Sequence, residues 1–170
     1  MKMPERFIWA ANVLDVQPAD TLLEIGCGTG LLASLLLPKL GKGHYTAIDR
    51  SGTAIAKATG KHESYVASGK ADFITGTLSD ATLKPKSYSK IFAFNVANLW
   101  KAPATELDSI RKLLKKGGSF YLFHQPPYDI TKQMVAEATQ VLQEHGFEIR
   151  ETIIRQLETV PAFCMVAQPI

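Results

Sequence analysis

The sequence predicts an α/β fold in which a doubly wound, mostly parallel sheet of seven strands ends in an antiparallel β-hairpin. Short apolar runs alternate with segments whose apolar residues recur at helical spacing, and this alternation is typical of parallel strands covered by helices on both faces. Near the C-terminus, the ranges 147–158 and 159–168 are β-rich runs with almost nothing between them, so we expect them to pair antiparallel. A length of 170 residues fits a single domain over residues 1–170.

The helices and strands are expected in the following order. Pro4 opens a helix within residues 1–20, a stretch that could cover a pocket. Five strands precede the hairpin, at 21–26, 44–49, 71–75, 90–96 and 118–124. Helical spacing occurs at Leu31, Leu32, Leu35 and Leu36 before Pro38, at Ile55, Ala58, His62 and Tyr65, and at Leu107, Ile110 and Leu114. Residues 75–89 have no such period, so we expect mostly loop there.

The composition indicates a soluble, cytoplasmic protein. Hydrophobic residues make up 46% of the chain, and no run of 18 apolar residues suggests a membrane span. The N-terminal segment reaches Glu5 and Asn12 too early for the apolar core of a signal peptide. Cys27 and Cys164 lie far apart with no CxxC pair, so we expect neither a disulfide framework nor a metal site.

The basic residues are interpreted as structural. A net charge of +3 could suit an anionic partner, but the densest basic cluster, RKLLKK at 111–116, lies where a helix is expected to end. Cations at that position complement the negative end of the helix dipole. No basic stripe interleaved with aromatic residues accompanies the cluster, so we expect no DNA partner.

The strongest chemical pattern is LLEIGCGTG, residues 22–30. A buried strand carries Glu24 and turns directly into a helix through Gly26, Gly28 and Gly30, so a ligand can approach the backbone where no side chain stands in its way. Asp49 ends the next strand, and a carboxylate there can accept both hydroxyls of a ribose. Together these residues predict a cofactor that contains a nucleoside.

Two classes of cofactor fit this pattern. Gly28, Gly30 and Ala33 satisfy the dinucleotide pattern G-x-G-x-x-A, so an NAD(P)-binding oxidoreductase is the alternative function. Glu24 favours the other class, because a pyrophosphate is anionic, whereas a sulfonium cofactor with a free amino group is cationic at that end.

The run E-x-G-x-G-x-G from Glu24 to Gly30, with Asp49 after it, resembles the class I S-adenosylmethionine-dependent methyltransferases, which have a Rossmann-like sheet. The turn LKKGG at 114–118 resembles that family's L-K-P-G-G, with Lys116 in place of proline, and the hairpin matches its last two strands. The likeness is greatest to small methyltransferases of unassigned substrate. It implies S-adenosylmethionine as the cofactor and transfer of a methyl group by direct displacement to an acceptor that we expect to be a small molecule.

The resemblance also implies roles for individual residues. The glycine loop with Glu24 would shape the methionine side of the pocket, with Cys27 as a small space-filling residue, and Asp49 would hold the ribose. After the third strand the family usually places an acidic residue against the adenine, whereas this chain has Thr77 and Leu78, whose hydroxyl and backbone N–H would replace that contact. The expected cofactor-binding residues are Glu24, Gly26, Cys27, Gly28, Gly30, Asp49, Arg50, Thr77, Leu78, Asn95 and Val96.

Few residues are needed for catalysis, because methyl transfer from a sulfonium depends mainly on alignment. A general base is required only where the acceptor must lose a proton. His124, at the carboxyl end of a strand, and Tyr128 are the catalytic candidates, although a histidine that only packs or faces solvent is the alternative. Asn98 and Trp100, together with Trp9 in the first helix, are the candidates for contact with the substrate.

The stretch HQPPYD, 124–129, reads like the polar-Pro-Pro-aromatic motif of enzymes that methylate adenine or glutamine amino groups. That motif follows the fourth strand, whereas Gln125 to Tyr128 follow the fifth, so the prolines are expected only to end a strand before a helix near Asp129 or Ile130.

With about twenty residues before the first strand, the pocket would be open. A homodimer could close it, and a cofactor-binding module that needs a partner subunit is a second alternative.

Overall fold

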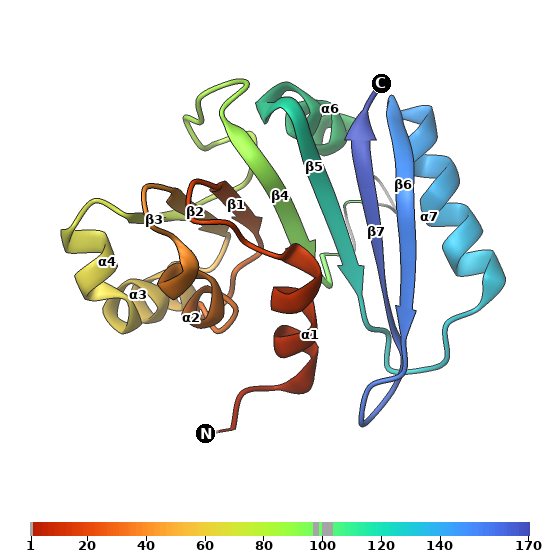
Figure 1. The fold of residues 1–170 in the computed structure, drawn as a ribbon, viewed down its shortest axis with the longest axis horizontal. Coiled ribbons are helices and arrows are strands. Elements are labelled where there is room, and N and C mark those ends of the chain that lie inside the picture. Colours follow the sequence, from red (N-terminus) through yellow and green to blue (C-terminus); the bar gives the residue numbers. More distant parts are fainter. Residues whose placement is uncertain (1, 97–98, 100–103) are drawn as a thin grey trace. The chain divides into compact units, whose positions relative to one another are not determined.

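The computed structural model describes residues 2–96, 99 and 104–170, which fall into two compact units, 1–82 and 83–170 (Figure 1). Asn98 and Trp100, two of the predicted substrate contacts, lie outside the described residues. The expectation of a single domain over residues 1–170 stays a prediction. None of the described helices combines the length and the apolar character that crossing a membrane requires.

The first unit is a parallel sheet with short helices. Its elements are α1 (Glu5–Leu14), β1 (Thr21–Ile25), α2 (Ala33–Leu36), the 3-10 helix η1 (Leu37–Lys39), β2 (His44–Asp49), α3 (Gly52–Lys61), α4 (Glu63–Ala67) and β3 (Ala71–Thr75). The strands pair in the order β3-β2-β1. Ile25 lies beside Ile48, and Asp49 lies beside Thr75, so the carboxyl ends of all three strands meet at one edge.

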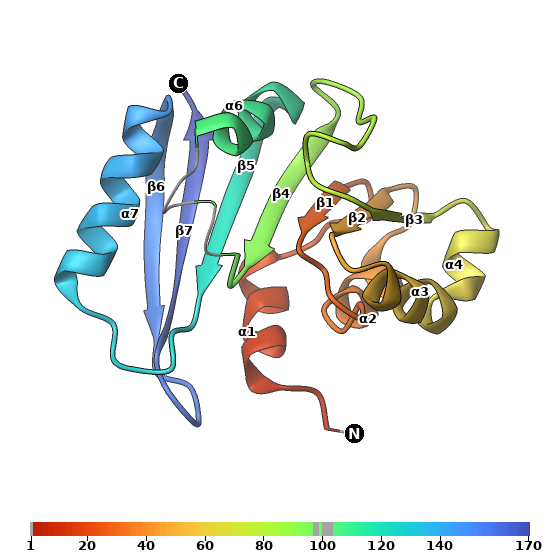
Figure 2. The same cartoon turned by 180° about the vertical axis from the view of Figure 1, so that it is seen from behind.

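The second unit is a mixed sheet. Its elements are β4 (Tyr88–Phe94), α6 (Ala104–Leu113), β5 (Leu114–His124), α7 (Lys132–Glu144), β6 (Phe147–Arg155) and β7 (Ala162–Pro169). The strand order is β4-β5-β7-β6, in which β4 and β5 are parallel and the other two pairs are antiparallel. Both α6 and α7 lie on the face of this sheet that is turned toward the viewer in Figure 2.

A bulge interrupts the pairing of β4 with β5. Tyr88 pairs with Leu114 and Lys90 pairs with Ser119, so the single residue Ser89 on β4 faces the four-residue stretch 115–118 on β5. A bulge leaves the extra residues without a ladder partner and pushes them out of the sheet. It therefore presents Lys115 and Lys116 to solvent at the amino-terminal ends of these strands.

The predicted fold class is confirmed: the described residues form seven strands, parallel in the core and antiparallel in the C-terminal hairpin. The predicted bounds of four strands were wrong by more than one residue. β4 runs from Tyr88 to Phe94 instead of 90–96, and β5 begins at Leu114 instead of Gly118. The hairpin strands, predicted at 147–158 and 159–168, are shorter and leave a turn between Arg155 and Ala162.

The helical predictions also need correction. Only Ala33–Leu36 is α-helical in the first connection, and Pro38 lies inside η1 instead of ending a longer helix. The second pattern divides into α3 and α4 at His62. Leu114 does not continue α6, and α7 begins at Lys132, where the Thr131 hydroxyl accepts the Met134 N–H at 3.1 Å. The loop predicted over 75–89 contains no helix, and β4 occupies its last two residues.

Candidate functional site

The glycine loop at the end of β1 is tied to the end of β2. Gly26, Gly28 and Gly30 all have positive φ, at 74°, 54° and 73°. The N–H groups of Gly26 and Cys27 donate to the Ile48 carbonyl at 2.8 and 3.1 Å, which holds the loop close to the neighbouring strand. L-residues rarely adopt this left-handed conformation, so glycine suits all three positions.

Gly28 and Gly30 differ in what surrounds them. A Cβ on Gly30 would lie 3.1 Å from the Ala58 Cβ and 3.2 Å from the His62 ring, so Gly30 packs against α3. A Cβ on Gly28 would meet nothing within 4 Å. The loop thus presents bare backbone to open space at Gly28, where a ligand can approach without meeting a side chain.

Asp49 joins the glycine loop to the turn after β2. Its Oδ2 accepts the Gly28 N–H at 2.8 Å, and its Oδ1 accepts the Ser51 N–H at 2.9 Å. A carboxylate offers about four acceptor sites, so these two bonds leave room for two further donors. The paired hydroxyls of a ribose match that remaining capacity.

Glu24 is a carboxyl group inside the unit. Only 3% of its surface is exposed, and the Tyr45 hydroxyl donates to its Oε2. Burial raises the pKa of Glu24 to about 8, against the opposing hydrogen bond from Tyr45 and with a smaller contribution from Asp49. Burial also raises the pKa of Tyr45. Glu24 is therefore largely neutral at pH 7, and a cation placed beside it would favour its ionised form.

His62 supports the glycine loop, a role that its place on a helix did not reveal. Its Nε2 donates to the Gly30 carbonyl at 2.8 Å, and its ring stacks on Phe73 with centroids 5.6 Å apart. The side chain is 5% exposed. The Ser34 hydroxyl donates to the same carbonyl at 3.3 Å, so the C-terminal end of the loop is held from α2 and from the junction of α3 and α4.

Asp80 supplies a carboxylate beside β3, three positions after the threonine that was expected to replace the family's acidic residue. Its Oδ2 accepts the Thr77 N–H at 3.0 Å and the Thr77 hydroxyl at 2.6 Å, and its N–H donates back to that hydroxyl at 3.2 Å. These hydrogen bonds from Thr77 lower the pKa of Asp80, and the nearby Arg50 adds to the effect. The hydroxyl that was expected to accept from a ligand is thus engaged within the chain.

Two hydrophobic members of the predicted set are buried. Cys27 and Leu78 are each 7% exposed. Burial raises the pKa of the Cys27 thiol, with Glu24 and Asp49 acting in the same direction. The interpretation of Cys27 as a space-filling residue agrees with this environment, because the thiolate is the nucleophilic form.

The remaining described candidates of the predicted rim lie in the second unit, after β4 and β5. Asn95 has φ 56°, and its Oδ1 accepts the Gln125 N–H at 2.7 Å. The Gln125 side-chain amide donates to the Val160 carbonyl at 3.2 Å, so the backbone N–H and the side-chain nitrogen of this residue both bond within the unit. His124 lies edge-on to Phe163, and Tyr128 is 57% exposed.

Two further histidines make contacts within the chain, and the expected substrate contact of Trp9 stays a prediction. His44 begins β2 and bonds Asp72 at 2.8 Å, at the amino-terminal end of the strands. His145 caps the end of α7, where its Nδ1 donates to the Val141 carbonyl at 2.8 Å. Trp9 lies half-buried in α1.

Comparison with known proteins gives one family match over more than half of the chain. A family model described as a methyltransferase domain matches residues 23–120. An uncharacterized methyltransferase of Bacillus subtilis, YdaC, is 25% identical over 169 residues, which cover 94% of this chain and 89% of YdaC. Other curated relatives are longer, and the chain spans 52% of one and 4% of two more.

Solved structures share the fold. A methyltransferase of Aquifex aeolicus described as dependent on S-adenosylmethionine has a TM-score of 0.78 at 15% identity, covering 99% of this chain and 91% of that protein. The [4+2]-cyclase SpnF has a TM-score of 0.79 at 14% identity, covering 97% and 81%. At these identities the likeness shows the fold alone, and the cyclase illustrates that the fold does not determine the reaction.

Proposed function

Because the chain belongs to the methyltransferase domain family, we propose that it transfers a methyl group from S-adenosylmethionine to a small-molecule acceptor by direct displacement. The observation that carries the proposal is the arrangement around Gly28. Open space adjoins its bare backbone, Asp49 binds its N–H, and the buried carboxyl of Glu24 lies in the strand that leads to the loop. A cofactor with a cationic amino acid at one end and a nucleoside at the other complements these groups.

Each group of the first unit has a task in this proposal. Glu24 attracts the ammonium of the methionine part, the backbone of Gly26 to Gly30 lies along the same part, and Asp49 accepts the ribose hydroxyls. The bound cofactor supplies a methyl group on a positively charged sulfur, which needs no further activation. The protein therefore acts mainly by holding acceptor, methyl carbon and sulfur in line.

Asp80 and Arg50 are the proposed partners of the adenine. Asp80 stands beside Gly76 and Thr77 at the carboxyl end of β3, and its carboxylate is exposed. An exposed carboxylate can accept a hydrogen bond from the adenine amino group. Asp80 would then take the place of the acidic residue that the family usually has three positions earlier, where this chain has Thr77, with Leu78 packing nearby.

The acceptor side is assigned to the second unit. Asn95 and Val96 would line it after β4, and His124 would accept a proton where the acceptor is a hydroxyl, with Tyr128 at the rim. Asn95, Val96 and Tyr128 are uncharged, and the neighbouring Asp129 and Lys132 oppose each other in charge. A nucleic acid acceptor would call for cations here. This composition supports a small acceptor, and the roles of Trp9, Asn98 and Trp100 stay predictions, as do a cytoplasmic location and a homodimer.

Thermal unfolding tests the cofactor directly. S-adenosylmethionine or its demethylated product at about 100 times the dissociation constant should stabilise the protein by about 2.7 kcal/mol, which corresponds to a rise in Tm of about 5 °C or more. NAD(H) should leave Tm unchanged. Stabilisation by NAD(H) alone would replace the proposal with the oxidoreductase function.

A matched pair of variants tests the ribose site. Asp49→Ala should weaken cofactor binding by at least tenfold, because it removes an acceptor of two ribose hydroxyls and a partner of the glycine loop. Asp72→Ala removes an exposed carboxylate at the opposite end of the strands and should bind normally. An unchanged calorimetric affinity for Asp49→Ala would remove Asp49 from the ribose site.

The acceptor can be sought with labelled cofactor and a fractionated cell extract. Label in the small-molecule fraction is the expected result. Label in nucleic acid or in protein would contradict the proposed acceptor class while leaving the methyltransferase function intact.

A further inference from the structure

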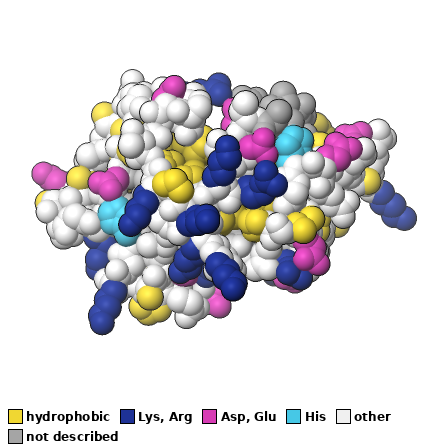
Figure 3. Space-filling view, turned by 90° about the horizontal axis from the view of Figure 1, so that it is seen from above, with side chains coloured by type: hydrophobic (Ala, Val, Ile, Leu, Met, Phe, Trp, Pro, Cys, Tyr) yellow, Lys and Arg dark blue, Asp and Glu magenta, His cyan; other side chains and the backbone are white. Residues whose placement is uncertain are grey.

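A cationic cavity lies in the second unit, at the amino-terminal ends of β4 and β5. Its volume is about 470 Å³. The described residues that line it include six cations and no carboxylate: Lys86, Arg111, Lys112, Lys115, Lys116 and Arg150, with Leu114, Gly117, Gly118, Gln168 and Pro169. Figure 3 shows lysine and arginine side chains gathered on the face of the molecule that carries this region.

Several elements bring these cations together. Arg111 and Lys112 come from the last turn of α6, Lys115 and Lys116 from the bulge of β5, Lys86 from the loop before β4 and Arg150 from β6. The Lys86 N–H donates to the Lys112 carbonyl at 3.0 Å, which fixes that loop to the end of α6. Gln168 accepts from the Arg150 Nε at 2.9 Å and donates to the Ser119 hydroxyl at 3.0 Å, which fixes β6 to β5.

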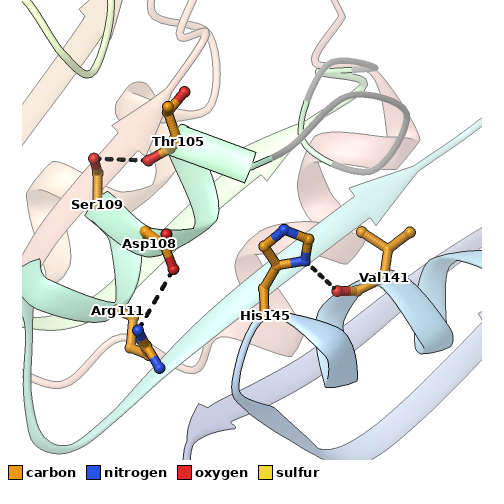
Figure 4. Close-up of polar contacts among 6 residues, drawn as sticks. All are labelled: Thr105, Asp108, Ser109, Arg111, Val141 and His145. Atoms are coloured by element: carbon orange, nitrogen blue, oxygen red, sulfur yellow. Dashed lines mark hydrogen bonds and ion pairs between the residues drawn. The ribbon is translucent and has the colours of Figure 1, made fainter.

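Two of the six cations have carboxylate partners. Arg111 contacts Asp108 at 3.5 Å within α6 (Figure 4), and Arg150 contacts Glu148 at 3.1 Å. No ion pair joins Lys86, Lys112, Lys115 or Lys116 to a carboxylate of the described chain. The cavity therefore holds an excess of about four positive charges.

The helix dipole does not account for this excess. The C-terminus of a helix carries about half a negative charge, which one or two cations in the last turn of α6 satisfy. Lys86 and Arg150 come from outside that helix and add positive charge to the same cavity. Like charges gathered in one place repel each other, so an arrangement of this kind destabilises the fold unless an anion binds there.

We propose that this cavity binds an anion that carries two or more phosphate groups in one compact molecule. Each phosphate monoester carries about −1.5 to −2 charges at pH 7, so two of them supply about −3 to −4 and match the excess. The planar guanidiniums of Arg111 and Arg150 suit bidentate contact with phosphate oxygens, and the lysines add point charges. A volume of about 470 Å³ is that of a small-ligand site, whose usual range is about 300 to 1,000 Å³.

The cavity is separate from the proposed acceptor residues of this unit. It lies at the amino-terminal end of β5, whereas His124 ends that strand. From Ser119 to His124 the strand extends roughly 16 Å at about 3.3 Å per residue. The proposal thus concerns a second ligand and does not depend on the proposed methyl transfer.

Inorganic pyrophosphate is the probe, measured by calorimetry on the full chain. Lys115→Gln/Lys116→Gln removes two cations from the exposed bulge with little change in side-chain size. Lys57→Gln/Lys61→Gln is the matched control, because it removes two exposed lysines from α3 in the other unit and leaves the same net charge. Citrate and a 20-nucleotide single-stranded RNA serve as competing classes of anion.

The expected result is pyrophosphate binding to the wild-type chain and to the control, at least tenfold weaker binding to Lys115→Gln/Lys116→Gln, and weakening by added salt. Circular dichroism spectra and thermal unfolding transitions like those of the wild-type chain would confirm that both double variants are folded. Absence of pyrophosphate binding, equal binding by the two variants, or equal affinity for citrate would overturn the proposal. RNA binding that depends on Lys115 and Lys116 without pyrophosphate binding would assign the surface to a polymer instead.

Discussion

Glu24 offers a direct test of the proposed cofactor site, because a cationic ligand must change its state of protonation. In the ligand-free protein, burial raises its pKa to about 8. At pH 7 a group with that pKa is about 90% protonated. An ammonium placed beside it favours the carboxylate, so the carboxyl group should lose its proton when the cofactor binds.

The size of the effect follows from the two pKa values. If binding lowers the pKa of Glu24 below about 6, the complex keeps less than about 10% of the proton at pH 7, so about 0.8 to 0.9 proton is released per cofactor bound. Affinity should then rise by up to tenfold per pH unit between about pH 6 and pH 8, and level off above that. Glu24→Gln has no proton to lose and should release none from this position.

Calorimetry in buffers of low and high ionisation enthalpy measures the release. The demethylated cofactor is the ligand, since it keeps the amino acid part and cannot react. Its own amino group is mostly protonated at pH 7, so most of the difference in proton release between wild type and Glu24→Gln comes from Glu24. A difference below about 0.2 proton at pH 7, with equal affinities at pH 8, would refute the placement of the cationic end of the cofactor beside Glu24.

Four further outcomes are expected. Between about pH 4.5 and 8, Glu24 is protonated in the folded chain and ionised in the unfolded chain. As the pH rises through that window, the unfolding free energy of the wild type should therefore fall by up to about 5 kcal/mol relative to Glu24→Gln. Urea titrations would measure the difference, and parallel pH profiles of the two proteins would contradict it. Gly28→Ala should bind the cofactor at least tenfold more weakly and should cost about 1–2 kcal/mol of stability. Gly30→Ala should mainly destabilise the fold. Equal cofactor affinity of Gly28→Ala and wild type would contradict the proposal that the cofactor lies against the backbone at Gly28. His62→Ala should cost about 2–4 kcal/mol in chemical unfolding and weaken cofactor binding, because it removes the hydrogen bond to the Gly30 carbonyl and a buried ring; destabilisation with unaltered binding would limit His62 to packing. Asp80→Asn should weaken binding of the cofactor several-fold, because the Asp80 carboxylate is proposed to accept from the adenine amino group. An equal loss of affinity for an analogue that lacks this amino group would exclude the contact.

The parts of the fold that were predictable depend on local pattern. β2 and β3 match their predicted bounds, and β1 differs by one residue, because short apolar runs bounded by turn residues mark strands. Leu114 is a residue whose secondary structure the local pattern predicted wrongly. It continues the helical spacing of Leu107 and Ile110, yet it pairs with Tyr88 of β4 and begins β5. Pairing with a residue 26 positions away in sequence decides between helix and strand here, and the spacing of nearby apolar residues gives no information about that pairing.

The candidate site divides in the same way. Glu24, Gly28 and Asp49 could be proposed from the sequence because their expected roles depend on positions at strand ends, which follow from the alternation of strands and helices. His62 reaches the Gly30 carbonyl from 32 residues away and left no local trace. Asp80 did leave one, since Thr77 and Asp80 have the T-x-x-D spacing of a capping arrangement, in which side chain and backbone bond reciprocally.

The basic cluster at 111–116 shows how the same residues can serve local and tertiary roles. Arg111 and Lys112 lie in the last turn of α6, as the interpretation of a helix end required. Further cations lie around that end, on the bulge of β5, on the loop before β4 and on β6. The positive charge of the cavity therefore exceeds what the helix dipole of α6 would balance. Cofactor and phosphate ligand would carry opposite charges at their binding groups and would not compete for one site. Any coupling of the cavity to methyl transfer would appear as a change in kcat or in cofactor affinity when the phosphate ligand binds.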